Sequence, residues 1–413
     1  MNLDNVLMVA AGLTVALGLT AAVTGTLLAP EQTMAPPAAT ASSPVKPSAT
    51  DPAEHDGEPD LAAADPAEPD APEAVEGGEP DAEPPPVVAD GAAPDAEEPP
   101  DRAGDDDKPA VEVVPAKPVV AGAPLELDAA LDLIVEDDLH GWLEQLASDA
   151  FEGRKTGTPG AAKAREFIVA RLRGAGVAEA VPGYAIPFER DGVQGVNLAA
   201  IIPGTDAERG AEVIVVGAHY DHLGVDPTLK GDDHIYNGAD NNASGTVAAL
   251  ALARALTRVP LHRTVLVLFF DAGEHDLAGS RSYVEAPLRP LDSTAAMVAI
   301  DSVARSPGRA IKIFGVENSP SFRGLSKGIL QERSGYPVAA ISGTGRLRKT
   351  TDSFPFQQAG VPILILHTAG HKDEGKVTDE VAEIDMPRLL AAARFSTALV
   401  HDLANADEAI RRR

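Results

Sequence analysis

Four side chains that can bind a metal ion stand at the ends of apolar runs or in a turn before a helix. They are His219, Asp240, Glu274 and Asp301. A mixture of imidazole and carboxylate groups suits zinc or a related divalent ion. The order and surroundings of these residues therefore predict metal-assisted chemistry, provided that the fold brings them together.

After Pro124 the chain alternates fully apolar runs with amphipathic stretches. Buried strands that alternate with helices are typical of a largely parallel sheet covered on both faces. We therefore predict an α/β fold with a mostly parallel, mixed central sheet and helices on both sides. Functional groups in such folds lie just beyond the carboxyl ends of the strands. The expected buried strands include residues 213–216, 265–270, 297–300 and 361–366.

Each candidate also has a plain structural interpretation, because an aspartate at a strand end usually caps a helix or forms a turn. Four matches in order make that interpretation weak for the set as a whole. Asp221 lies two residues after His219, on the same side of the strand, and can orient the imidazole. The remaining histidines of this region are expected on the surface rather than as ligands. They are His222, His234, His275 and His371.

Longer motifs around these residues resemble peptidase family M28, a group of co-catalytic two-zinc aminopeptidases. The resemblance covers about residues 140–400, which is nearly all of the predicted folded part. The motifs that carry it are Leu146–Arg154, Thr156–Gly160, Gly217–Gly224, Gly238–Gly245 and Leu277–Ser280. They are long enough to imply the fold of that family.

The resemblance also implies a role for each candidate. Asp240 would bridge two zinc ions, and His219 and Asp301 would complete the first zinc site. Glu274 would serve the second site, and Asp221 would be the aspartate beside the first histidine. A working member of the family releases N-terminal residues, so its partners would be the N-termini of peptides or proteins.

The sequence departs from the family at two functional positions, and glycine stands at both. Gly273 replaces the first glutamate of a pair, which is the family's general base, and Gly375 replaces the last histidine ligand. Asn241 replaces a second aspartate in the bridging motif. We therefore expect one zinc ion at most. Residues that could move into the vacancy are Asp271, Glu274, His275, His371 and Glu374.

Three hypotheses about function follow from these departures. The first is a metallopeptidase-like domain that has weak or lost activity and acts in binding or scaffolding at the cell envelope. The second is an active zinc-dependent aminopeptidase or hydrolase with a rearranged site. The third is another amide-directed enzyme that uses one metal ion. Fold analogy alone permits all three.

The N-terminal third of the chain is not expected to be globular. Residues 7–28 are uncharged and long enough to span a bilayer, so we predict that residues 1–30 are a membrane anchor or, if cleaved, a secretion signal. Residues 31–125 lack aromatic side chains and hold 23 acidic and 4 basic residues. This composition predicts a disordered linker over residues 31–124, followed by the M28-like domain over residues 125–413.

The overall charge and the absence of cysteine limit the remaining classes of function. The formal net charge is −29, which has the wrong sign for binding nucleic acid. With no cysteine, neither disulfides nor thiolate ligands are available. We expect the folded domain to lie outside the cytoplasm, tethered to the cell envelope, or to be secreted if the anchor is removed.

Overall fold

The computed structural model describes residues 123–306, 308, 310–322, 338–341, 349–368 and 370–410. The predicted membrane segment and acidic linker lie outside these residues. Among the helices of the described part, none combines the length and the hydropathy needed to cross a bilayer.

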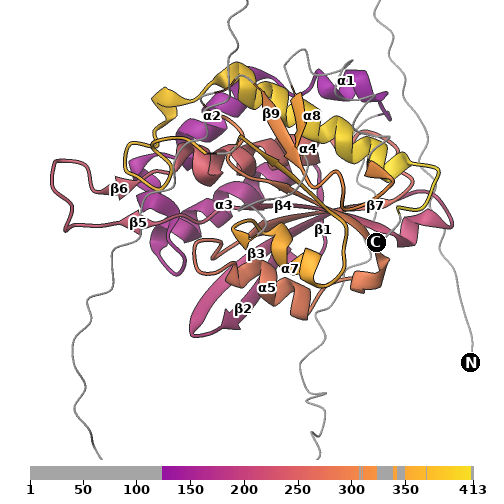
Figure 1. The fold of residues 1–413 in the computed structure, drawn as a ribbon, viewed down its shortest axis with the longest axis horizontal. Coiled ribbons are helices and arrows are strands. Elements are labelled where there is room, and N and C mark those ends of the chain that lie inside the picture. The colour runs from indigo at the N-terminus through magenta and orange to yellow at the C-terminus, as the bar shows by residue number, and fades with distance from the viewer. Residues whose placement is uncertain are drawn as a thin grey trace, which may run out of the picture. The chain divides into compact units, whose positions relative to one another are not determined.

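The centre of the domain is a nine-stranded sheet in the order β1-β3-β7-β4-β8-β11-β9-β10, with β2 paired to β3 (Figure 1). Its strands are β1 (Ala178–Glu179), β2 (Ala185–Arg190), β3 (Val193–Ile202), β4 (Val213–His219), β7 (Thr264–Phe270), β8 (Thr294–Ile300), β9 (Ile311–Phe314), β10 (Val338–Ile341) and β11 (Ile363–His367). A separate pair is formed by β5 (Gly224–Val225) and β6 (Ile235–Tyr236). The neighbours β7, β4, β8 and β11 run parallel, whereas β3 and β9 pair antiparallel with β7 and β11.

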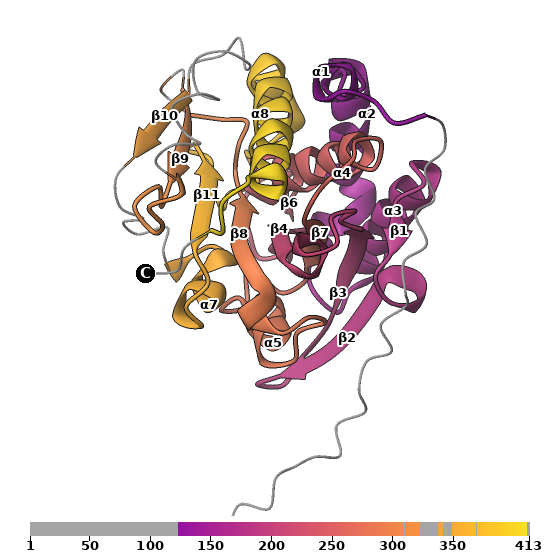
Figure 2. The same ribbon diagram turned by 90° about the vertical axis from the view of Figure 1, so that its right-hand side faces the viewer.

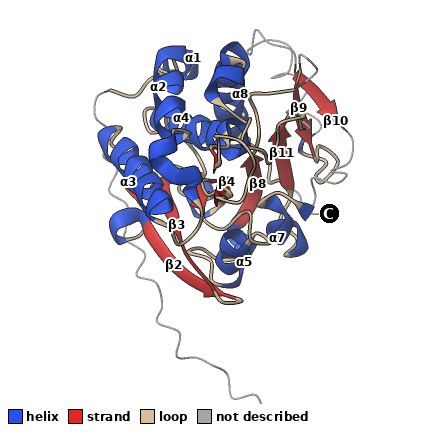
Figure 3. Cartoon of the chain, turned by 90° about the vertical axis from the view of Figure 1, so that its left-hand side faces the viewer, coloured by secondary structure: helices blue, strands red, loops and turns tan. Residues whose placement is uncertain are grey.

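Helices cover both faces of this sheet (Figures 2 and 3). They are α1 (Leu127–Leu131), α2 (Glu136–Leu146), α3 (Pro159–Gly174), α4 (Gly245–Leu256), α5 (Ala278–Glu285), α7 (Ser353–Gln358) and α8 (Met386–Asn405). Apolar side chains of α1 to α4 and α8 pack with one set of alternating strand residues, and those of α5 and α7 pack with the other set. The predicted fold class is therefore confirmed.

Two local features show how the sequence directs the helices. Helix α3 begins with Pro159 in its first turn and the Thr158 hydroxyl accepting a hydrogen bond from the backbone N–H of Ala161 at 3.4 Å. Leu, Ile, Val and Trp recur at helical spacing from Leu125 to Ala150, and this spacing alone predicts one helix, but the segment forms α1 and α2 with a turn between them. Ile134 in this turn is fully buried, so tertiary packing of the connection overrides the helical pattern.

The register of the parallel strands brings the candidate residues to one edge of the sheet. His219 is the last residue of β4 and lies opposite Phe270, the last residue of β7. Asp301 follows the last residue of β8, and His367 ends β11. Loops from four neighbouring strands therefore meet at the same edge, as expected for an α/β site.

Candidate metal centre

His219 and Asp301 face each other at the carboxyl ends of β4 and β8. The His219 Nε2 atom lies 3.9 Å from Asp301 Oδ1. On its other side, His219 Nδ1 lies 3.3 Å from the carbonyl oxygen of Asp221 and 3.5 Å from its Oδ1. Although burial disfavours the charged ring, the carboxylates of Asp221 and Asp301 raise the pKa of His219 well above its usual range. This arrangement directs Nε2 toward the position that a metal ion would take.

Asp221 is fully buried and fixes the loop that follows β7. Its carboxylate accepts hydrogen bonds from the backbone N–H groups of Gly273 at 2.8 Å and Glu274 at 3.2 Å. One carboxylate therefore contacts the His219 ring and holds the next loop against it. The positioning role of Asp221 stays a prediction, and these are the contacts through which it would act.

Gly273 packs directly against the His219 ring, and there is no space for a side chain at this position. A Cβ atom placed on Gly273 would lie 2.7 Å from His219 Cγ and 2.9 Å from His219 Nδ1. The imidazole would have to move before a glutamate could be accommodated. The His219 ring therefore occupies the space that a side chain at position 273 would need.

Among the described residues, the polar partners of Glu274 are His222 and Asn241. Its Oε1 atom lies 2.9 Å from His222 Nδ1 and accepts a hydrogen bond from Asn241 Nδ2 at 3.1 Å. Although burial opposes ionisation, the His222 contact and nearby charges lower the pKa of Glu274 to about 2. His222 itself is fully buried, so the expectation that it lies on the surface was wrong.

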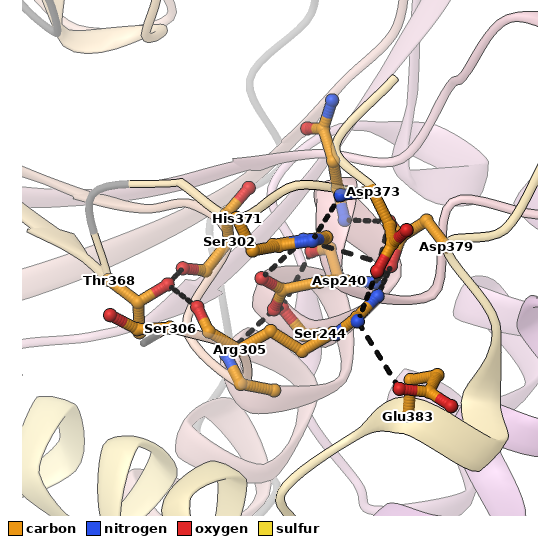
Figure 4. A network of polar contacts seen from close by, with 12 residues as sticks. Asp240, Ser244, Ser302, Arg305, Ser306, Thr368, His371, Asp373, Asp379 and Glu383 are labelled. Atoms are coloured by element: carbon orange, nitrogen blue, oxygen red, sulfur yellow. Dashed lines mark hydrogen bonds and ion pairs between the residues drawn. The ribbon is translucent and has the colours of Figure 1, made fainter. Parts of the chain in front are cut away.

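Asp240 lies fully buried in the turn Ala239–Ser244, which precedes α4. Its Oδ1 atom accepts hydrogen bonds from the Ser244 hydroxyl at 3.0 Å and from the backbone N–H of Ala304 at 2.7 Å. Its Oδ2 atom lies 3.3 Å from His371 Nε2, in the network drawn in Figure 4. The His371 side chain is only 5% exposed, so the surface expectation was wrong for this residue too.

Gly375 contributes no ligand, and its surroundings are open. A Cβ atom placed on it would meet nothing within 4 Å, and its φ of +68° is in the left-handed region that favours glycine. The loop therefore turns at the position where the resemblance places the family's last histidine ligand. His371, four residues earlier in the same loop, is the histidine that contacts Asp240.

The donor atoms form two pairs, His219 with Asp301 and Asp240 with His371, rather than one cluster. Within the described ranges, no three His, Asp or Glu side chains come close enough together to hold a metal ion. The first pair could contribute two ligands to one ion, because the contact of His219 Nδ1 with the Asp221 carbonyl leaves Nε2 facing Asp301. The structure thus brings His219 to Asp301, whereas the contacts of Glu274 are with His222 and Asn241.

Two functional residues escaped the sequence analysis as individuals. Asp352, at the start of α7, is buried, and its Oδ1 atom has no hydrogen-bond partner among the described residues. Burial, and then the charges of Asp301 and Asp221, raise its pKa to about 7, although His219 acts in the opposite direction. Only its place beside a loop near the site could have suggested it, because Thr-Asp-Ser is also an ordinary helix start.

Arg154 is the second such residue, and it joins three segments of the site. Its guanidinium is fully buried and donates hydrogen bonds to four backbone carbonyls, each 2.6 to 3.0 Å away. The acceptors belong to Leu146, Tyr220, Asn237 and Gly238. The arginine therefore ties the end of β4 to the loop that presents Asp240.

Comparison with known proteins identifies the family. Residues 197–400 match the sequence model described as peptidase family M28. Aminopeptidase YwaD of Bacillus subtilis (strain 168) is 26% identical over 200 residues, which cover 46% of this chain and 41% of that protein. The chain thus spans about two fifths of the length of this curated relative.

Solved structures show the same fold at low sequence identity. The LapA aminopeptidase of Legionella pneumophila has a TM-score of 0.55 and 18% identity, with 68% of this chain and 75% of that chain covered. BSAP, a zinc aminopeptidase from Bacillus subtilis, has a TM-score of 0.52 and 15% identity, with coverages of 67% and 97%. Glutaminyl cyclase of Porphyromonas gingivalis has a TM-score of 0.54 and 20% identity, with coverages of 66% and 99%. With the family match and the fold in agreement, the region of residues 197–400 is assigned to peptidase family M28.

Proposed function

We propose that this protein is an aminopeptidase-like M28 domain whose peptidase activity is weak or lost, and which acts by binding at the cell envelope. The observation that carries the proposal is the close packing of Gly273 against the His219 ring. A Cβ atom at position 273 would lie only 2.7 Å from His219 Cγ. A general base is absent from this position, and its return would displace a candidate ligand.

The loss of a general base has a predictable effect on rate. Positioned general acid–base groups contribute roughly 10²- to 10⁴-fold to catalysis. The engagement of Glu274 with His222 and Asn241 adds to this loss, because it occupies the residue that was predicted to serve the second metal site. Together these changes support a site that retains recognition of a peptide N-terminus while turnover falls to a trace.

We further propose that the site takes one zinc ion at most, held by His219 and Asp301. A zinc ion bound there would polarise a carbonyl or lower the pKa of a bound water. The chain's own residues position this pair, since Asp221 contacts the imidazole and binds the backbone of the adjoining loop. Residues 7–28 would anchor the domain to the membrane, or would be removed from a secreted form.

An active enzyme with a rearranged site is the second candidate, and Asp352 is the observation that favours it. This buried carboxylate has an oxygen without a hydrogen-bond partner in the described region, and its pKa is raised to about 7. A carboxylate with a pKa near neutrality suits a general base. In this alternative, Asp352 would replace the missing glutamate.

The test is turnover of a panel of aminoacyl-coumarin amides by the full chain, with zinc added. We expect kcat/KM values at least a thousandfold below the ordinary enzyme range of about 10⁴ to 10⁸ M⁻¹s⁻¹. Values within that range that disappear in His219→Ala would overturn the proposal. If such activity is found, a large fall of kcat in Asp352→Asn with little change in KM would assign the base role to Asp352.

Binding is measured separately, with a peptide that has a free N-terminus and the same peptide acetylated. The proposal predicts that the free peptide binds and that acetylation weakens binding at least tenfold. Equal affinity for the two peptides would contradict recognition of an N-terminus at this site.

A further inference from the structure

We propose that His371 stands in the second metal position as a hydrogen-bond partner of Asp240, so that an imidazole of the chain replaces a second zinc ion there. This inference rests on the proposed function, because it concerns the same site. It concerns the half of the site where the residues do not fit a metal ion, in contrast to the pair His219 and Asp301.

The first argument is that both oxygens of Asp240 face groups of the chain in this conformation. Asp240 Oδ1 accepts a hydrogen bond from the N–H of Ala304 at 2.7 Å, and the Ser244 hydroxyl shares its single hydrogen between Oδ1 and the Asp240 carbonyl oxygen. Asp240 Oδ2 faces His371 Nε2 at 3.3 Å. Both of these atoms are buried, and neither has another hydrogen bond of regular geometry among the described residues, which leaves each as the natural partner of the other.

The second argument concerns the hydrogen on the His371 ring. The backbone N–H of Asp373 donates to His371 Nδ1 at 3.2 Å, so Nδ1 presents a lone pair. A neutral imidazole then carries its hydrogen on Nε2, the atom that faces Asp240. A metal-bound histidine has the opposite arrangement, because its free ring nitrogen donates its N–H to an acceptor. His371 is therefore arranged to donate to Asp240 rather than to bind a metal ion.

The third argument is that the His371 loop is fastened to the Asp240 turn (Figure 4). Arg305 Nη2 lies 2.6 Å from Asp373 Oδ2, and Arg305 Nη1 lies 3.4 Å from Asp379 Oδ1. Asp379 in turn accepts hydrogen bonds from the backbone N–H groups of Asp240 at 3.1 Å and Asn241 at 3.0 Å. These contacts link both sides of the His371–Asp240 pair, so the imidazole is held in place from two directions.

The fourth argument is that the other predicted ligand of this position is engaged elsewhere. Glu274 contacts His222 and Asn241, and both contacts use Oε1. These contacts hold the Glu274 carboxylate beside His222 and Asn241, and a movement of this group toward the second position would weaken its contact with the buried His222 ring. The two-zinc arrangement implied by the family would thus require changes on both sides of Asp240.

The experiment is ¹⁵N NMR of the full chain labelled at histidine, before and after addition of ¹¹³Cd²⁺ as an NMR-active substitute for zinc. The variant His371→Gln assigns the His371 signals, and His219→Gln assigns the control. We expect His371 to show an unprotonated Nδ1 and a protonated Nε2, with neither signal split by ¹¹³Cd. Splitting of His371 Nε2 by ¹¹³Cd, or a protonated Nδ1 with an unprotonated Nε2, would overturn the inference.

The outcome is separable from that of the proposed function. His371 bound to cadmium in a chain without aminopeptidase turnover would refute the inference and leave the proposed function standing. Ordinary turnover in a chain whose His371 signals are unaffected by cadmium would refute the proposed function and leave the inference standing. If cadmium does not bind at all, the proton position on the His371 ring still decides the inference.

Discussion

Individual buried polar side chains define this site more clearly than any motif does. Asp352 illustrates this, because its carboxylate is enclosed beside His219, Asp301 and Asp221. Such a group is poorly solvated, and neighbouring negative charges oppose its ionisation further. Its protonation should therefore be visible in the stability of the metal-free protein.

Replacing Asp352 with asparagine should stabilise the metal-free protein at alkaline pH. The folded-state pKa is about 7 against an ordinary 3.8, so the contribution of Asp352 to stability is fully present below pH 3.8 and is lost as pH rises through 7. Relative to the wild type, Asp352→Asn should gain up to roughly 4 kcal/mol between about pH 4 and pH 8. Urea unfolding of the wild type and the variant at the two pH values measures this gain. If the difference in unfolding free energy between variant and wild type is the same at both pH values, Asp352 is not enclosed as described.

Arg154 should be among the residues whose replacement destabilises the domain most. Arg154→Met keeps the length of the side chain but leaves four buried carbonyls without their donor. We expect a loss of about 3 kcal/mol or more in the free energy of unfolding. Arg394→Met is the matched control, because among the described residues the Arg394 side chain donates to one carbonyl, that of Ile134. Similar losses in both variants would contradict the linking role of Arg154.

At the scale of elements, the sequence was most informative where burial is continuous. Strands β4, β7 and β11 are apolar along their whole length, and they were predicted because only a sheet covered on both faces buries such runs. The loop after β11 was not predictable in the same way. The placement of His371 depends on Asp373 and Asp379, which follow it in the same loop, and on Arg305, which comes from a distant part of the chain, and no periodicity reveals these contacts.

The junction between the Asp240 turn and α4 gives a prediction at this scale. A Cβ atom on Gly245 would lie 2.3 Å from the carbonyl oxygen of Ile300, which directly precedes Asp301. Gly245→Ala should therefore destabilise the protein, since one backbone segment must move. Gly141 in α2 is the control, because its Cβ would meet nothing within 4 Å. Gly141→Ala should stabilise by up to about 1 kcal/mol through helix propensity, and thermal unfolding should show shifts of opposite sign.

For the whole molecule, the family and the fold class were predictable, whereas the state of the site was not. Long motifs such as Gly217–Gly224 carry the resemblance, and they lie within the residues that match the family. The consequences of Gly273 and Gly375 depend on how neighbouring side chains fill the space. The His219 ring packs against Gly273, and His371, four residues before Gly375, contacts Asp240. Both are tertiary responses that the sequence alone did not specify.

The most direct test of this account is the zinc content of the full chain after dialysis against a weak chelator, which removes ions held loosely by acidic residues. The account predicts at most one zinc per chain, and any bound zinc should be lost in His219→Ala. His222→Ala serves as the control, because His222 contacts Glu274 rather than the His219–Asp301 pair. Two tightly bound zinc ions per chain would contradict the account, since both halves of the metal centre would then be intact.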